Sequence, residues 1–104
     1  RAMGAALLAE PVTARQAENW GMIWEAVPDA SFEDVVAQRA AKLAAGPTGA
    51  YGALKQALRG AFDQSLEAQL ALEARLQGLC GASADFREGV AAFLEKRAPV
   101  FSGR

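Results

Sequence analysis

The groups in this chain best suited to chemistry lie together near its carboxyl end. Lys96 and Arg97 form a basic pair, and Phe93 precedes them by one helical turn. In one interpretation the pair is structural, because cations in the last turn of a helix offset its dipole. In the other it is a binding site, since a compact ammonium suits a phosphate and the phenylalanine ring can lie against a flat heterocycle. The spacing alone does not decide between the two.

Among the carboxylates, Glu73 has the most unusual position. It lies at i, i+4 spacing from Gln69 and Gln77, between two rows of leucines on one predicted helix. A carboxylate buried between such rows has a raised pKa and can act as a general acid or base. The alternative is an interface carboxylate, bonded by the neighbouring glutamines or by a partner chain. The other carboxylates fall at predicted caps or on polar helix faces, where they are ordinary solvated charges.

The sequence contains no second set of groups with catalytic or metal-binding spacing. It has no histidine and a single cysteine, Cys80, so the thiol has no imidazole to activate it and most zinc sites are excluded. The glycines form no GxGxxG or P-loop, and the turn signal at 46–49 has no lysine where a P-loop needs one. We therefore predict no catalytic residue and no metal ligand within these residues.

The composition limits the partners that the chain can have. Eleven Lys and Arg against twelve Asp and Glu give a net charge of −1, which removes the usual electrostatic case for nucleic acid or an anionic membrane. No apolar run approaches the roughly 20 residues that span a bilayer, and the chain opens on Arg1 without the apolar core of a signal peptide. One unpaired cysteine fits a reducing compartment. We expect no nucleic acid, no membrane segment and a cytoplasmic location.

Six amphipathic segments, separated by Gly and Pro signals, must position these groups. The predicted helices are 1–9, 14–20, 32–45, 48–62, 65–79 and 84–96, the last of them capped by Ser83. Thr13 and Gln16 have capping-box spacing at the start of the second helix, and Gly21 has the position of a glycine cap at its end. Ser31 and Asp34, an acidic variant of the same box, are expected to open the third.

No segment has the sequence pattern of a β-strand. Residues 22–27 lie between a glycine and a proline, are too short for a helix, and predict an extended crossing segment. No run of β-branched residues occurs elsewhere. The predicted fold class is therefore all-α.

The fifth predicted helix has apolar residues on two flanks. One flank holds Leu66 and Leu70, and the other holds Leu72, Leu76 and Leu79. A helix with two apolar flanks is expected to contact two neighbours rather than one. This is the pattern of a helix that helps to build a larger assembly.

Several motifs occur in the order and spacing of a known family. They are Arg1–Glu10, Thr13–Glu18 followed by Gly21-Met22-Ile23, Ala84–Arg97 with its Asp85, Glu88-Gly89, Ala92-Phe93 and Lys96-Arg97, and the tail Pro99–Arg104. Across nearly all of the chain they resemble the crotonase superfamily, the enoyl-CoA hydratases and isomerases. Each motif alone is weak, and their combination is specific to the superfamily.

The resemblance implies that residues 1–104 are the carboxyl-terminal helical domain of a longer crotonase-fold chain, the region that builds its trimer. The ββα spiral core, with the oxyanion hole and the acid–base residue, is absent from these residues, so the segment alone is predicted to be inactive. The resemblance also implies that Phe93 and Lys96 approach the adenine and 3′-phosphate of coenzyme A, with Arg97 adjacent. The coenzyme A thioester is then a substrate, with no tightly bound cofactor.

Further expectations follow from the same resemblance. The full-length protein is expected to be a homo-oligomer, a trimer or a dimer of trimers, and the isolated segment to self-associate through leucine faces that the core otherwise covers. Within the family, residues 20–24 and 81–85 look most like the branch that isomerises ring-1,2-epoxyphenylacetyl-CoA in phenylacetate catabolism. The alternative is a stand-alone helical protein-interaction module with no ligand, which the lack of an active site supports.

Overall fold

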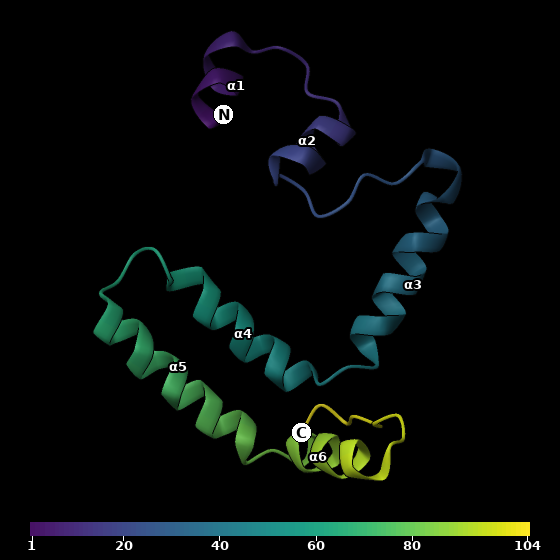
Figure 1. Cartoon of the computed structure of the whole chain (residues 1–104), viewed down its shortest axis with the longest axis vertical. Coiled ribbons are helices and arrows are strands. Elements are labelled where there is room, and N and C mark those ends of the chain that lie inside the picture. Colours follow the sequence, from purple (N-terminus) through teal and green to yellow (C-terminus); the bar gives the residue numbers. More distant parts are fainter. The chain divides into compact units, whose positions relative to one another are not determined.

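A computed structural model describes all 104 residues and contains helices but no strand, which confirms the all-α prediction. The elements are α1 (Ala2–Leu8), α2 (Ala14–Trp20), the 3-10 turn η1 (Asp29–Ser31), α3 (Phe32–Ala44), α4 (Thr48–Gly60), α5 (Leu66–Gly81) and α6 (Ala84–Glu95) (Figure 1). No helix has the length and apolar character needed to cross a bilayer. The chain divides into two compact units, residues 1–37 and 38–104, which are described separately.

In the first unit, α2 begins and ends as its sequence predicts. The Gln16 backbone N–H donates to the Thr13 hydroxyl at 3.2 Å, and the Thr13 backbone N–H donates to Gln16 Oε1 at 3.0 Å. This reciprocal pair is the predicted capping box. At the other end Gly21 takes the left-handed conformation, with φ 75°, that a side chain disfavours. Both caps are local signals, and both are confirmed.

Two expectations for the same unit are wrong. The segment 22–27 is not helical, but it is bent at residues 22–24 rather than extended throughout, because the cap at Gly21 turns the chain at once. Ser31 does not open α3 with a capping box. It lies inside η1, where its hydroxyl donates to the Pro28 carbonyl at 3.2 Å. The fixed φ of the proline favours this turn over a direct helix start.

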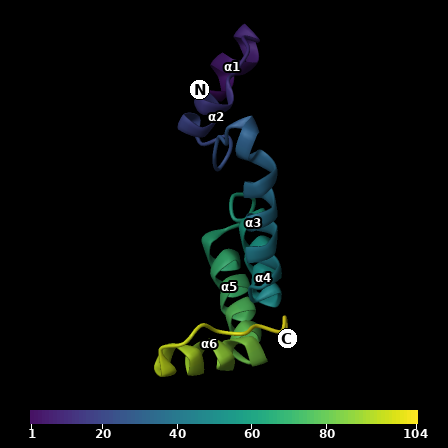
Figure 2. The ribbon, with the colours of Figure 1, turned by 90° about the vertical axis from the view of Figure 1, so that its right-hand side faces the viewer.

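In the second unit, α4 and α5 form an antiparallel pair, and α6 runs across one end of it (Figure 2). Serine hydroxyls begin two of these helices: Ser65 accepts from the Ala68 N–H at 3.2 Å and Ser83 from the Phe86 N–H at 3.0 Å. The segment after α6, residues 97–104, returns along that helix. We call this segment the tail.

Close packing at the start of α4 requires a glycine. Gly46 is buried, and a Cβ built there would lie 2.0 Å from the Tyr51 hydroxyl oxygen. The tyrosine ring therefore lies over the bare backbone and ties the end of α3 to the first turn of α4. Any side chain at this position would displace the ring.

The second unit nevertheless has very little core. Leu76 on α5 and Ala92 on α6 carry the only buried apolar side chains of the whole chain. The prediction that the fifth helix has two neighbours is confirmed, since α5 contacts both α4 and α6. Its flank of Leu66 and Leu70 stays 69% and 56% exposed. An apolar face this open is typical of a surface that other protein covers.

Candidate functional site

The turn that ends α6 places Lys96 in an unusual backbone conformation. The Arg97 N–H donates to the Ala92 carbonyl at 3.0 Å and the Lys96 N–H to the Phe93 carbonyl at 3.3 Å, which is the Schellman pattern of a helix end. In that pattern the left-handed residue is usually glycine, but here it is Lys96, with φ 56° and ψ 36°. A left-handed conformation costs a residue with a Cβ about 1 kcal/mol.

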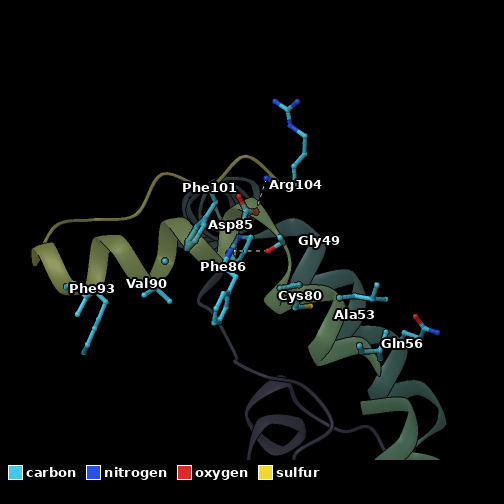
Figure 3. A pocket seen from close by; sticks show the side chains of 18 residues that line it. Gly49, Ala53, Gln56, Cys80, Asp85, Phe86, Val90, Phe93, Phe101 and Arg104 are labelled. Carbon is cyan, nitrogen blue, oxygen red and sulfur yellow. Dashed lines mark hydrogen bonds between the residues drawn. The ribbon is translucent and has the colours of Figure 1, made fainter. Parts of the chain in front are cut away.

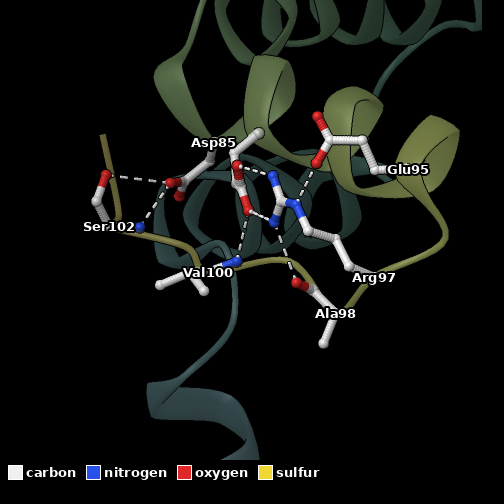
Figure 4. Close-up of polar contacts among 7 residues, drawn as sticks. Asp85, Glu95, Arg97, Ala98, Val100 and Ser102 are labelled. Atoms are coloured by element: carbon white, nitrogen blue, oxygen red, sulfur yellow. Dashed lines mark hydrogen bonds and ion pairs between the residues drawn. The ribbon is translucent and has the colours of Figure 1, made fainter.

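The next residue, Arg97, is held by two carboxylates of α6. Its Nη1 and Nη2 donate to the two oxygens of Glu88 at 2.6 and 2.9 Å, and its Nε donates to Glu95 Oε2 at 2.6 Å (Figure 4). A bidentate pair of this kind fixes direction as well as distance. The Arg97 hydrogen bonds, with the Val100 N–H, lower the pKa of Glu88 to about 2, and the two carboxylates raise the pKa of Arg97.

The tail is fixed to α6 through its backbone. The Val100 N–H donates to Glu88 Oε1 at 2.8 Å. One oxygen of Asp85 accepts from the backbone N–H and the hydroxyl of Ser102 at 2.7 and 3.2 Å, and the other accepts from the Gly103 N–H at 2.9 Å. Asp85 is itself only 6% exposed. We call Asp85, Glu88 and Arg97 the tail clamp.

Packing of the tail also depends on a glycine. Gly103 has φ 77°, and a Cβ there would lie 2.6 Å from the Thr48 hydroxyl oxygen at the start of α4. The ring of Phe101 lies near Gly89 of α6, 3.7 Å from where a Cβ on that glycine would be. The Asp85 N–H donates to the Arg104 carbonyl at 2.8 Å. The clamp thus brings the end of the chain against both α4 and α6.

An open groove of about 670 Å³ lies between α4, α5, α6 and the tail (Figure 3). Its wall is mainly apolar and includes Ala53, Leu76, Leu79, Phe86, Val90 and Phe101. The only cysteine, Cys80, also lines it and is a free thiol. No group of three or more His, Cys, Asp or Glu side chains is placed to hold a metal ion.

The residues predicted to bind a ligand lie together at the end of α6 but differ in their surroundings. Phe93 lines one end of the groove and is 82% exposed. Lys96 is exposed and enters no ion pair. Arg97 uses its Nε, Nη1 and Nη2 atoms within the chain. Of the three side chains, the ring and the ammonium are available to a ligand as they stand.

The structure resolves the two interpretations of Glu73 in part. Its side chain is exposed, so the burial that the acid–base interpretation requires is not present. Gln69 Nε2 donates to Glu73 Oε1 at 2.5 Å, which is the bonding partner that the interface interpretation named. No partner chain is needed for this contact.

The interpretation of the sequence missed Asp85 and Glu88 as the residues that hold the tail. Both belong to the carboxylates that the sequence predicts to be solvated or to cap a helix. Their only local signal is i, i+3 spacing on one face of α6, and this is common on helices. Their partners lie 9 to 18 residues away in the tail, which has no periodicity of its own.

Comparison with known protein families gives a match over residues 1–104 to the family described as Enoyl-CoA hydratase/isomerase. A relative named "Probable enoyl-CoA hydratase", from Rhodobacter capsulatus, is 60% identical over 104 residues, which are 100% of this chain and 40% of the relative. The "1,2-epoxyphenylacetyl-CoA isomerase" of Escherichia coli is 50% identical over the same shares of each chain.

Solved structures give the same result. An enoyl-CoA hydratase from Geobacillus kaustophilus has a TM-score of 0.85 and 32% identity, over 94% of this chain and 37% of the other. An enoyl-CoA hydratase from Polaromonas sp. JS666 has a TM-score of 0.88 and 25% identity, over 98% and 40%. The chain thus spans about two fifths of the length of the curated relatives it matches.

Proposed function

The chain belongs to the enoyl-CoA hydratase/isomerase family, and we propose that it is the carboxyl-terminal helical part of an enzyme that acts through a thioester enolate. The family match confirms the resemblance drawn from the sequence motifs. The chain matches its relatives from end to end but spans 40% of their length, and none of its residues has the setting of a general base or a nucleophile. The oxyanion hole and the acid–base residue are therefore proposed to lie on a spiral domain outside these residues.

Within this proposal, the chain supplies part of the coenzyme A site and no catalytic residue. The observation that carries it is the exposed, unpaired ammonium of Lys96, one turn from the exposed ring of Phe93. An ammonium suits the 3′-phosphate, and a phenylalanine face suits the adenine. Arg97 is included in the proposed coenzyme A site because it is the cation next to Lys96. Coenzyme A enters as the thioester of the substrate and is not held as a resident cofactor.

The proposed substrate is ring-1,2-epoxyphenylacetyl-CoA, which the enzyme isomerises in phenylacetate catabolism. The relative that bears this activity in its name is 50% identical, and the motifs at 20–24 and 81–85 favour the same branch. Another relative, 60% identical, is named as a probable hydratase, so an enoyl-CoA hydratase is the nearest competing activity. Assays of the whole protein with ring-1,2-epoxyphenylacetyl-CoA and with an enoyl-CoA separate the isomerase from the hydratase, because only the hydratase adds water across a double bond.

The second proposed role is assembly. The open leucine face of α5 and the apolar groove support a homo-oligomer, a trimer or a dimer of trimers in the whole protein. A cytoplasmic location completes the proposal, because acyl-CoA substrates and a single free thiol both fit a reducing compartment.

The test compares coenzyme A with 3′-dephospho-coenzyme A in titrations of the whole protein. We expect Lys96→Ala to reduce the preference for the phosphorylated ligand by about tenfold, the value of one charge-assisted hydrogen bond. Lys55→Ala, at an exposed lysine of α4, is the matched control and should keep the preference. Equal affinities for the two ligands in the unsubstituted protein would refute a phosphate role for Lys96.

The alternative, a helical interaction module with no ligand, is favoured by one observation. Only Leu76 and Ala92 are buried among the apolar residues, so most of the apolar surface is available to partner proteins. The same titration discriminates between the two functions, because the module predicts that neither form of coenzyme A binds at all.

A further inference from the structure

Two helices of the chain end in the same hydrogen-bond pattern but with different residues at the critical position. At the end of α2, the Met22 N–H donates to the Ala17 carbonyl at 2.8 Å and the Gly21 N–H to the Glu18 carbonyl at 2.9 Å. The end of α6 repeats these two bonds with Lys96 in the place of Gly21. Glycine adopts this conformation without steric cost, whereas lysine does not.

The residue after each turn shows what offsets that cost. After Gly21 comes Met22, whose side chain is 62% exposed. After Lys96 comes Arg97, whose guanidinium makes three charge-assisted hydrogen bonds of 2.6 to 2.9 Å to Glu88 and Glu95. These bonds hold the chain on the far side of the turn and favour the left-handed conformation of Lys96.

The conformation of this turn determines where the lysine side chain begins. A residue that leaves the left-handed region for the extended or right-handed one redirects its Cα–Cβ bond. A long lysine stem already has many rotamers, so an unfixed origin would spread its ammonium over a still larger volume. A defined phosphate contact therefore needs a defined turn.

We propose that Glu88 is a positioning residue for the phosphate contact of Lys96: its bidentate pair with Arg97 holds the left-handed turn from which the lysine projects. This inference rests on the proposed coenzyme A function. It also assigns Arg97 a role that is distinct from direct contact with the ligand. Glu88 needs no contact with coenzyme A in this role.

The second bond of Glu88 strengthens the argument. The Val100 N–H donates to Glu88 Oε1 at 2.8 Å, so one carboxylate fixes both the residue after the turn and the tail that follows it. The low pKa of Glu88, about 2, keeps the carboxylate charged at neutral pH. The pair is thus intact under the conditions in which an acyl-CoA enzyme works.

The test is the substitution Glu88→Gln in the whole protein, with the ratio of affinities for coenzyme A and 3′-dephospho-coenzyme A as the readout. Simple electrostatics predicts that removing a negative charge near a phosphate strengthens its binding. A positioning role predicts the opposite sign, namely that the preference for the 3′-phosphate falls by about tenfold, as it does in Lys96→Ala. The sign of the change therefore separates the two effects.

Glu95→Gln is the matched control. Glu95 lies next to Lys96 in the sequence and its side chain is 61% exposed. It makes one bond to Arg97 and none to the rest of the tail. This substitution removes the same charge, but it leaves the bidentate pair in place. We expect the phosphate preference to stay the same or to rise, and a tenfold fall equal to that of Glu88→Gln would overturn the proposal.

Arg97→Lys is the second variant, and it keeps the positive charge while abolishing bidentate geometry. If Arg97 acts through the clamp, the phosphate preference falls with Arg97→Lys as it does with Glu88→Gln. A preference unchanged in both variants, together with a loss in Lys96→Ala, would refute the positioning role and keep the proposed function. A preference unchanged in Lys96→Ala would refute both.

Discussion

The two ends of the α4–α5–α6 unit use opposite kinds of surface. Around α6 and the tail, Asp85, Glu88 and Arg97 are bonded within the chain, and no buried side-chain nitrogen or oxygen lacks a partner. Along α4 and α5, the leucines Leu54, Leu58, Leu66 and Leu70 are each more than half exposed. The polar contacts of the first region are complete within one chain, whereas the leucines of the second are left uncovered by the chain.

This difference shows which part of the unit is self-sufficient. Buried charges are tolerated only when their donors and acceptors are paired, and the tail supplies the partners of Asp85 from within the same chain. The apolar faces have no such partner within the chain, because covering them takes area from another surface. We infer that the tail clamp forms within the chain and that the leucine faces are completed by other protein.

The largest expected effect comes from removing the buried carboxylate of the clamp. Asp85→Ala leaves the Ser102 and Gly103 N–H groups without an acceptor, and we expect the free energy of tail opening to fall by about 2–3 kcal/mol. Native-state amide exchange at Val100 measures this loss, since its N–H is held by Glu88 and not by Asp85.

Glu67→Ala is the control for this substitution. Glu67 follows the cap Ser65 of α5 at the same spacing as Asp85 follows the cap Ser83 of α6, so both variants lose a charge that favours a helix start. Only Asp85 holds the tail. Equal exchange at Val100 in the two variants would show that the hydrogen bonds of Asp85 do not hold the tail.

An effect of intermediate size is expected at Lys96, in the turn that ends α6, and there the substitution should raise stability rather than lower it. Lys96→Gly removes the steric cost of the left-handed conformation, and we expect the free energy of unfolding to rise by about 1 kcal/mol relative to Lys96→Ala. Urea unfolding followed by circular dichroism measures the difference. The glycine variant should still lose the phosphate preference, which would separate stability from function. If it unfolds at the same urea concentration as the alanine variant, the turn carries no cost.

The smallest effect is expected from pH. The pKa of Glu88 is lowered from 4.5 to about 2 in the folded chain, mainly by Arg97. The stability that this pair contributes is therefore fully present above pH 4.5 and lost as the pH falls from there toward 2. Unfolding measured over this range should show a decline that is smaller in Glu88→Gln. Identical pH profiles would mean that the pair contributes nothing to the folded state.

The helices and most of their caps could be predicted from the sequence because their causes are local. The apolar period of 84–96, the cap Ser83 and the box at Thr13 and Gln16 all act within one turn of the chain. The third helix also began where its pattern predicts. Only its cap was wrong, because Pro28 favoured a 3-10 turn that took the Ser31 hydroxyl.

The tail clamp could not be predicted for a corresponding physical reason. Asp85 reaches Ser102 and Gly103 across 17 and 18 residues, and no periodicity links a helix to an irregular segment. The left-handed conformation of Lys96 could not be predicted either, because glycine is the only reliable sign of that conformation in a sequence. The candidate ligand residues came from the family resemblance, because their spacing alone left two interpretations open.

Light scattering over a concentration series of the isolated chain tests the central claim most directly. If the leucine faces of α4 and α5 bind other protein, the isolated chain self-associates, so that the measured mass exceeds 10.9 kDa and rises with concentration. The substitutions Leu66→Ser and Leu70→Ser should then lower the measured mass toward that of the monomer. A species that stays at 10.9 kDa at every concentration would contradict the account, because the exposed faces would then need no partner.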